Sequence, residues 1–215
     1  MTWRAEERRG LIGAARRTLE LGLTHGTSGN VSARASGGMA ITPTGMPYGE
    51  LEPDDIVLMA LDGTVAAGER RLPSSEWRMH AAIYLARPDV GAVVHGHSPA
   101  ATAVSCLGRD LPAFHYMVAA AGGDSIRCAP YALFGSAAIA AGAVKALDGR
   151  RACFLAQHGL MAIGESFDKA IALAVEVEFL SGVFLSVAGV ASPRVLSAAQ
   201  MREVLEGFKS YGQRG

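Results

Sequence analysis

Short apolar runs with strand character alternate with helical patterns along this chain, and this alternation limits its fold more than any other feature. It continues across all 215 residues without an internal repeat, a low-complexity segment or a clear linker. A chain of this length commonly folds as one domain, and 50% of the residues are hydrophobic, enough for a substantial core. The pattern therefore predicts a single α/β domain over residues 1–215, with a central sheet covered by helices.

The element boundaries are predicted from apolar spacing and from turn or cap residues. Strands are predicted at residues 30–34, 39–42, 56–61, 90–94 and 152–156. Helices are predicted at residues 4–21, from Pro73-Ser-Ser-Glu76 to about 87, from about 99, and at 135–147, 168–189 and 197–209. Pro88 disfavours helical geometry in the residue before it, so the second helix should end there.

The charge balance excludes two classes of partner. Lys plus Arg and Asp plus Glu number 20 each, so the formal net charge is zero. A neutral chain has no general attraction for nucleic acid or for an anionic membrane, and neither is an expected partner. An anionic ligand must instead be bound locally by a few well-placed groups.

The cysteines and the apolar stretches indicate a cytoplasmic location. Cys106, Cys128 and Cys153 are odd in number and widely spaced, unlike a disulfide framework, so we expect buried, reduced thiols. The N-terminal residues contain no apolar core of the signal-peptide type. The apolar stretch 170–191 contains Glu176 and Glu178, which favours a buried or subunit-interface helix over a membrane span.

Three histidines occur where predicted strands end. His95 and His97 are two residues apart, so the two-residue period of a strand places both rings on one face. His158 follows the strand predicted at 152–156. Three imidazoles at strand ends can converge on zinc and leave a fourth position open. The alternative is that they are separate, hydrogen-bonded histidines, and the matching context of His158 favours the metal.

Glu76 stands at the predicted start of a helix, where two interpretations are open. A carboxylate in the first turn is often only stabilised by the helix dipole. The functional interpretation is a metal-site carboxylate that acts as a general base. His80 lies four residues later on the same helix face, where packing or support for Glu76 is favoured over ligation.

Three polar loops together favour a phosphate site. They are Gly26-Thr-Ser-Gly29-Asn30, Thr42-Pro-Thr44-Gly45 and Ser74-Ser75. These segments offer hydroxyls, an amide donor, backbone N–H groups and one helix N-terminus. Each alone is an ordinary turn or cap, and neither a Walker motif nor a dinucleotide-binding fingerprint is present.

The order of several segments resembles a known family. The segments are GTSGNVS, ITPTGMPYGEL, LPSSEW, VVHGHS, LPAFHYMVAAAGG, CAPYALFG and QHGLMA. In this order they resemble the class II aldolases of the aldolase/adducin type, over nearly the whole chain from Leu21 to the FKSYG tail. The resemblance implies a mainly antiparallel sheet, one zinc ion per subunit and a cyclic homotetramer with active sites between subunits. Manganese, cobalt or iron stay open as alternatives to zinc, because three imidazoles can hold each of them.

The resemblance also implies a role for each matching residue. His95, His97 and His158 would ligate zinc, and Glu76 would be the acid/base group and approach the metal when the site is empty. Tyr116 would donate a proton into a neighbouring subunit's site, and Tyr211, in a tail that is mobile from about residue 207, would help to close over the aldehyde. The implied phosphate cradle consists of Asn30, Thr44, Gly45, Ser74 and Ser75.

The implied reaction is reversible cleavage of a ketose 1-phosphate to dihydroxyacetone phosphate and an aldehyde. The substrate would be L-fuculose 1-phosphate or a related 5-deoxypentulose 1-phosphate, such as 5-deoxyribulose or methylthioribulose 1-phosphate. Three alternatives stay open: a pentulose-phosphate 4-epimerase, a methylthioribulose-1-phosphate dehydratase and a non-catalytic adducin-like interaction module. Glu76 argues against the first, the tyrosine segments against the second, and the intact histidines against the third.

Overall fold

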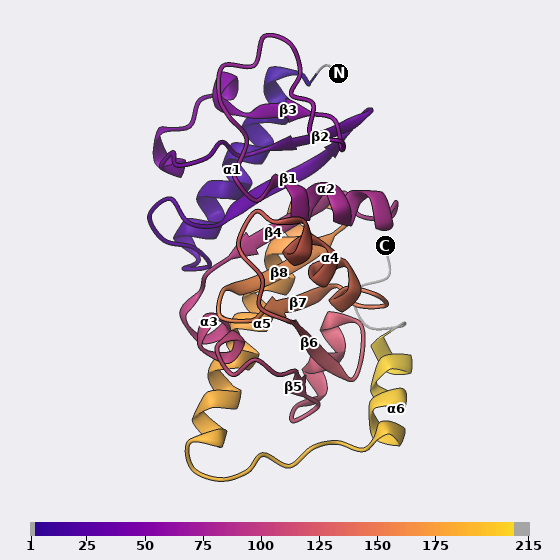
Figure 1. Cartoon of the computed structure of the whole chain (residues 1–215). Coiled ribbons are helices and arrows are strands. Elements are labelled where there is room, and N and C mark those ends of the chain that lie inside the picture. The colour runs from indigo at the N-terminus through magenta and orange to yellow at the C-terminus, as the bar shows by residue number, and fades with distance from the viewer. Residues whose placement is uncertain (1–2, 209–215) are drawn as a thin grey trace.

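Eight strands form one sheet within residues 3–208, the part of the chain that this computed structural model describes. The strand order is β3-β2-β1-β4-β8-β7-β6-β5 (Figure 1). The strands are β1 (Asn30–Ala35), β2 (Gly38–Ile41), β3 (Val57–Met59), β4 (Ala92–Gly96), β5 (Leu111–Pro112), β6 (Ser125–Ala129), β7 (Ala152–Leu155) and β8 (Gly159–Gly164). Only the β6–β7 pair is parallel among these strands, so the expectation of a mainly antiparallel sheet is confirmed.

Helices cover both faces of the sheet. The α-helices are α1 (Ala5–Glu20), α2 (Trp77–Ala86), α3 (Pro99–Ser105), α4 (Ala137–Ala146), α5 (Phe167–Ala188) and α6 (Ala198–Phe208). Short 3₁₀ helices are η1 (Tyr48–Glu50), η2 (Pro53–Asp55) and η3 (Tyr116–Ala121). Helices α1, α3 and α5 pack on one face, and α2 and α4 pack on the other (Figure 1). The predicted α/β domain with a covered central sheet is therefore confirmed.

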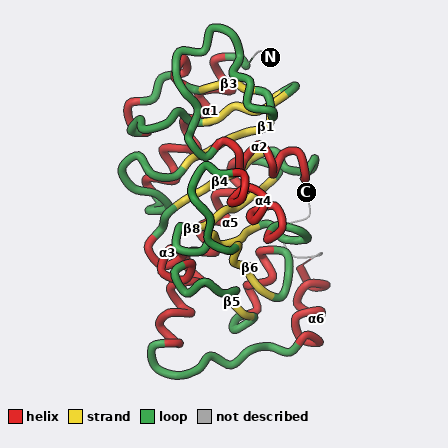
Figure 2. The backbone as a smooth tube through the Cα atoms, in the orientation of Figure 1, coloured by secondary structure: helices red, strands yellow, loops and turns green. Residues whose placement is uncertain are grey.

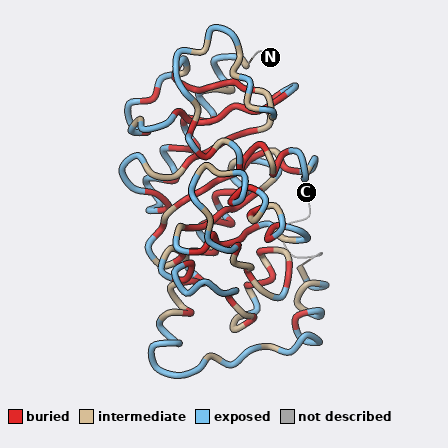
Figure 3. Tube along the Cα trace, in the orientation of Figure 1, coloured by how far each residue is buried: buried red, intermediate tan, exposed pale blue. Residues whose placement is uncertain are grey.

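Strand alternation divides the core into two layers, one on each side of the sheet. On β4, Val94 packs in the layer below α1, α3 and α5, whereas Val93 packs in the layer of α2 and α4. On β7, Phe154 packs in the first layer and Cys153 in the second. Because both faces are buried, the central strands are apolar on both sides, and Figure 3 shows them buried across the middle of the molecule.

Helix α6 stands apart from the two main layers. A largely exposed loop over residues 189–197 leads to it from α5 (Figures 2 and 3). The helix packs through Met201 against Ala113 and Ala119, the latter on η3. Residues 207 and 208 are the last two of this helix, and the rest of the tail predicted to be mobile from about residue 207 lies outside the described residues. Tyr211 lies outside the described residues.

Most of the predicted elements are present, but three strands were missed. Strand β8 begins directly after His158, and the turn before it at residues 156–158 contains no glycine, proline, asparagine or aspartate that would mark a turn in the sequence. Strand β6 contains Arg127 and is only partly buried, which weakens its apolar pattern. Strand β5 has two residues, too few for any periodicity.

Helix α5 covers most of the long apolar stretch. Within the described residues it is the one helix that is long and apolar enough to cross a membrane. However, residues along its inner side, including Ile171, Ala174 and Val177, are buried against the sheet. It is a core helix of a soluble domain.

The cysteine prediction was wrong for one residue. All three thiols are free, but Cys106 is exposed, Cys128 is half-buried and only Cys153 is fully buried. Cys106 is the C-cap residue of α3, directly after the last residue of that helix.

Candidate active site

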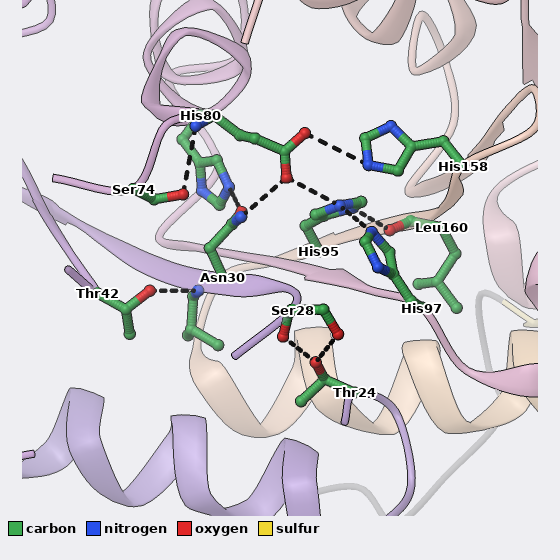
Figure 4. A network of polar contacts seen from close by, with 12 residues as sticks. Thr24, Ser28, Asn30, Thr42, Ser74, His80, His95, His97, His158 and Leu160 are labelled. Carbon is green, nitrogen blue, oxygen red and sulfur yellow. Dashed lines mark hydrogen bonds and ion pairs between the residues drawn. The ribbon is translucent and has the colours of Figure 1, made fainter. Parts of the chain in front are cut away.

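The three predicted histidines converge with Glu76 into one cluster. Their potential ligand atoms all lie within 4.8 Å of one another. Figure 4 shows the rings of His95, His97 and His158 gathered at this point. His95 Nε2 is 2.9 Å from His97 Nε2 and 3.1 Å from Glu76 Oε2, and His158 Nε2 is 3.4 Å from Glu76 Oε1. The structure therefore brings together the four residues that the sequence analysis selected, and separate histidines are excluded.

Sheet pairing explains this convergence. His95 lies within β4, opposite Asn30 of β1 on one side and Met161 of β8 on the other. His158 stands in the short loop between β7 and β8 and so returns to the same end of the sheet. Gly159 permits the close approach, because a Cβ there would lie 2.4 Å from the Gly96 carbonyl oxygen.

The tautomer of His95 is fixed by the backbone. Its Nδ1–H donates a hydrogen bond of 2.8 Å to the Leu160 carbonyl oxygen (Figure 4). This leaves the lone pair of Nε2 directed at the cluster, which is the form that a metal needs.

Burial holds the rings of His97 and His158 in the neutral form. Burial, together with the nearby His95 and His158, lowers the pKa of His97 to about 3. Burial and His95 lower the pKa of His158 to about 4. Neutral imidazoles at pH 7 are the species that ligate divalent metals.

Glu76 faces the histidines instead of capping the helix that it precedes. It is the N-cap residue of α2, but its side chain makes no cap hydrogen bond. Burial raises the pKa of Glu76, yet the proximity of His95 and His158 and a hydrogen bond from Asn30 outweigh burial and lower it overall. The carboxylate is therefore ionised, and stabilisation by the helix dipole is not its main interaction.

The cluster fits a divalent metal. A tetrahedral site with bonds of about 2.0–2.1 Å has neighbouring ligand atoms about 3.3 Å apart, close to the separations of 2.9, 3.1 and 3.4 Å found here. Glu76 Oε1 is buried and has no hydrogen-bond partner among the described residues. A buried anionic oxygen without a donor is costly, and coordination to a cation would satisfy it.

A cavity of about 370 Å³ opens beside the cluster. All five residues of the predicted phosphate cradle line it: Asn30, Thr44, Gly45, Ser74 and Ser75. Glu76, His97 and His158 line it as well, so the anion-type loops and the metal-type cluster share one space. Asn30, Ser74 and Glu76 are buried, whereas Thr44 and Ser75 are exposed at its mouth.

Backbone geometry shapes the polar side of this cavity. Gly29 has a φ of +79°, and a Cβ there would lie 2.8 Å from the His95 carbonyl oxygen. Ser74 Oγ accepts a hydrogen bond from the Glu76 N–H at 3.3 Å, which holds the start of α2 against the cavity. The helix N-terminus adds a favourable dipole for an anion.

The cavity has further lining residues for which the sequence analysis predicted no role. Tyr131, Phe134 and Gln157 form part of its wall. Tyr131 and Phe134 belong to the CAPYALFG segment, and both side chains are more than 60% exposed. Aromatic residues in a loop are a weak sequence signal on their own, because only the folded chain places this loop above Ser75.

Tyr116 does not reach the cavity of its own chain. It begins η3, is 51% exposed and is absent from the cavity lining. Any contact between Tyr116 and a reacting substrate would have to come from another copy of the chain.

The chain belongs to the class II aldolase and adducin family. Residues 9–185 match the family model described as "Class II Aldolase and Adducin N-terminal domain". Together with the intact site and with the aldolases described next, this match identifies the chain as an enzyme, a class II aldolase and hence a lyase of carbohydrate metabolism.

Particular aldolases are similar over nearly their whole length. A 5-methylthioribulose-1-phosphate/5-deoxyribulose-1-phosphate aldolase of Rhodospirillum rubrum is 51% identical over 205 residues, which cover 95% of this chain and 92% of that protein. An L-fuculose phosphate aldolase of Escherichia coli K12 is 50% identical and covers 90% of each chain. A solved structure of an L-fuculose 1-phosphate aldolase superposes with a TM-score of 0.91 at 39% identity, covering 96% of this chain and 98% of its own.

Proposed function

We propose that this enzyme is zinc-dependent and reversibly cleaves a ketose 1-phosphate to dihydroxyacetone phosphate and an aldehyde. The observation that carries the proposal is the shared cavity, in which the cluster of three histidines and Glu76 adjoins a cradle of anion-type loops. A metal site alone would fit many reactions, and an anion site alone would fit many ligands. Their combination fits a phosphorylated substrate with a carbonyl group near its phosphate.

The phosphate would bind at the polar side of the cavity. Hydroxyl groups of Thr44, Ser74 and Ser75, the amide of Asn30 and the backbone of Gly45 line that side. With the α2 N-terminus behind Ser74, these groups supply donors without a fixed positive charge. This is consistent with a chain whose net charge is zero.

His95, His97 and His158 would hold the metal, with Glu76 as a fourth ligand before substrate arrives. A bound divalent cation supplies Lewis-acid polarisation of the ketone oxygen, which makes breakage of the C3–C4 bond possible without a Schiff-base lysine. Three imidazoles suit zinc among the divalent metals.

Two proton transfers balance the cleavage. The C4 hydroxyl loses its proton through Tyr116 of a neighbouring subunit to solvent, the C3–C4 bond breaks, and the aldehyde leaves. The electron pair stays on C3, and Glu76, which takes up a proton from solvent once substrate is bound, passes that proton to C3 to give dihydroxyacetone phosphate. In the synthetic direction the same groups act in reverse order.

The proposal includes a cyclic homotetramer in the cytoplasm. Tyr116 is exposed and remote from its own cavity, as a residue that completes a neighbour's site would be. Tyr211 would close over the aldehyde end of that site. The exposed aromatic residues Tyr131 and Phe134 would then contribute to the aldehyde pocket.

The similar proteins narrow the substrate to two kinds of sugar. The Rhodospirillum rubrum protein carries the name of a 5-methylthioribulose-1-phosphate and 5-deoxyribulose-1-phosphate aldolase, and the Escherichia coli protein that of an L-fuculose phosphate aldolase. These substrates share the phosphate end and differ in the aldehyde. We therefore propose L-fuculose 1-phosphate or a 5-deoxypentulose 1-phosphate for this enzyme.

The test is an assay of dihydroxyacetone phosphate release across a panel of these ketose 1-phosphates. Activity should disappear on chelation and return on addition of zinc. His95→Ala should neither retain the metal nor regain activity. Glu76→Gln should keep the histidine ligands but lose about 10²–10⁴-fold in kcat, the usual contribution of a general acid/base.

Two outcomes would contradict the proposal. Full activity of His95→Ala would exclude the metal site, and no release from any member of the panel would exclude the aldolase reaction on these sugars. Glu20→Gln, an exposed carboxylate at the end of α1, is the matched control for Glu76→Gln and should leave kcat unchanged.

A further inference from the structure

Five buried polar side chains form a continuous chain of hydrogen bonds that ends at Glu76. Tyr84 OH is 2.9 Å from Ser32 Oγ, which is 2.6 Å from His80 Nδ1. His80 Nε2 is 2.5 Å from Asn30 Oδ1, and Asn30 Nδ2 is 3.0 Å from Glu76 Oε2 (Figure 4 shows the segment from His80 to Asn30). None of the five side chains is more than 6% exposed.

The direction of each hydrogen bond follows from the geometry of the Asn30 amide. Its Nδ2, which can only donate, lies 3.0 Å from Glu76 Oε2, and its Oδ1, which can only accept, lies 2.5 Å from His80 Nε2. The opposite amide orientation would place two acceptor oxygens 3.0 Å apart. His80 must therefore donate to Asn30 from Nε2.

The other ring nitrogen completes the assignment. Burial lowers the pKa of His80 to about 3, so the ring is neutral and carries only the proton on Nε2. Its Nδ1 must then accept from the Ser32 hydroxyl, and Ser32 Oγ accepts from Tyr84 OH in turn. Every donor in the chain points toward Glu76, so the dipoles add along it.

Asn30 is the branch point between this chain and the cavity. It lines the cavity, and among the described residues its Nδ2 donates a hydrogen bond to Glu76 alone. An amide nitrogen carries two hydrogens, and the second remains for an anion in the cradle. If the amide rotated by 180°, it would present an oxygen to both the carboxylate and the anion.

We propose that His80 is a positioning residue that locks the Asn30 amide with both N–H groups toward the active site, one on Glu76 and one on the substrate phosphate. His80 does not line the cavity, and its two ring nitrogens bond to Asn30 and Ser32, so it acts on the site through Asn30. Ser32 and Tyr84 hold the tautomer of His80 that this requires. The inference rests on the proposed function for the identity of the anion.

The experiment measures binding of inorganic phosphate to the metal-loaded enzyme by titration calorimetry. In His80→Leu the Asn30 oxygen has no donor and the amide can rotate, so the Kd should rise at least about tenfold, the low end for loss of one hydrogen bond to a charged group. His80→Gln can place an N–H near the position of Nε2, and should restore the Kd to within about twofold of the wild type.

Ser181→Ala is the matched control. Ser181 is also a fully buried polar residue, and its hydroxyl donates to the Val177 carbonyl oxygen within α5. It should lose a similar buried hydrogen bond and leave the phosphate Kd unchanged. Wild-type affinity in a folded His80→Leu enzyme would overturn the proposal.

A second measurement needs no folded variant. In the wild-type enzyme with ¹⁵N-labelled histidine, the His80 ring should show a proton on Nε2, a bare Nδ1 and no titration between pH 5.5 and 8.5. A proton on Nδ1 would overturn the inference. If phosphate binds in the expected manner but no ketose 1-phosphate is cleaved, the inference stands and the proposed reaction fails.

Discussion

At the scale of single residues, the site holds its histidines neutral at a thermodynamic cost. The pKa values of His97 and His158 are lowered to about 3 and about 4, well below the value of about 6.5 for a free imidazole. In the unfolded chain both rings take up protons near pH 6.5, whereas the folded chain resists until the pH is near 4. Between these values the unfolded state binds more protons, so acid favours unfolding.

This predicts a pH dependence for the metal-free protein. Its free energy of unfolding should be highest above pH 6.5 and should fall toward pH 4, by at most about 1.4 kcal/mol per pH unit for each histidine. Urea denaturation at pH 7, 6 and 5 measures the slope. The double variant His97→Asn/His158→Asn should flatten it, and a wild-type protein equally stable at pH 7 and pH 5 would contradict the assignment.

The residues of the site were more predictable than their partners. His95, His97, His158 and Glu76 carry chemistry in their residue types, and strand ends made their convergence inferable from sequence. The lock on Asn30 was not inferable, because Ser32 and His80 are 48 positions apart and meet only when α2 packs on the sheet.

At the scale of elements, α3 connects two of the metal-type ligands. Its N-cap, Ser98, directly follows His97. At its other end, the Ser105 carbonyl oxygen accepts from the Gln157 N–H at 3.1 Å, and Ser105 Oγ accepts from the His158 N–H at 3.3 Å. The two ends of this short helix therefore hold His97 and His158, and its length helps to set the distance between them.

A second element holds α3 in place. The Glu178 carboxylate of α5 accepts hydrogen bonds of 2.9 and 2.8 Å from the N–H groups of Ala100 and Ala101, in the first turn of α3. Helix α5 thus covers the sheet and also holds α3. Glu178, one of the two glutamates that argued against a membrane span, caps the N-terminus of α3 beside the site.

Removing the Ser105 hydroxyl should therefore weaken the site. Ser105→Ala frees the backbone N–H of His158 from one acceptor, and we expect the metal Kd to rise about tenfold, the low end for groups that orient metal ligands. Competition with a chromogenic chelator measures this Kd, with Ser181→Ala as the control for loss of a buried serine. An unchanged metal Kd in Ser105→Ala would show that α3 does not position His158.

Elements with local sequence signals were predicted, whereas elements that depend on distant contacts were missed. The short α3 was predicted from Pro99 onward, because its proline and cap are local signals. Strand β8 was missed, because the loop before it reverses at Gln157, with a φ of +53°, and contains no glycine before the strand begins. The left-handed conformation of Gln157 is held by the hydrogen bond from its N–H to the Ser105 carbonyl oxygen, and Ser105 is distant in sequence.

At the scale of the whole molecule, several exposed apolar side chains have no cover within the described part of the chain. Val175 and Phe179 on α5 are 38% and 60% exposed, and Tyr116 is 51% exposed. Exposed apolar surface of this kind is common at subunit interfaces. It agrees with the proposal that the active site is shared between copies of the chain.

Mixing two inactive variants tests this sharing. His95→Ala lacks a metal ligand, and Tyr116→Phe lacks the proposed proton donor, so each homo-oligomer should be inactive or nearly so. After the two are mixed, dissociated and reassembled, about a quarter of the sites should combine an intact metal cluster with an intact neighbouring tyrosine if assembly is random. No recovery of activity, with light scattering showing that mixed oligomers form, would place Tyr116 outside the neighbour's site.

The central pairing of β4 with β1 and β8 has a consequence for how the protein acquires its metal. This pairing places Asn30 of β1 opposite His95 on one side of β4 and Met161 of β8 opposite His95 on the other. Each pair joins residues about 65 positions apart in the sequence. Contacts that close such long loops form slowly. A ribosome-bound chain that ends before His158 has no complete set of ligands, so metal capture should be among the last steps of maturation, and its rate should report the closing of the sheet.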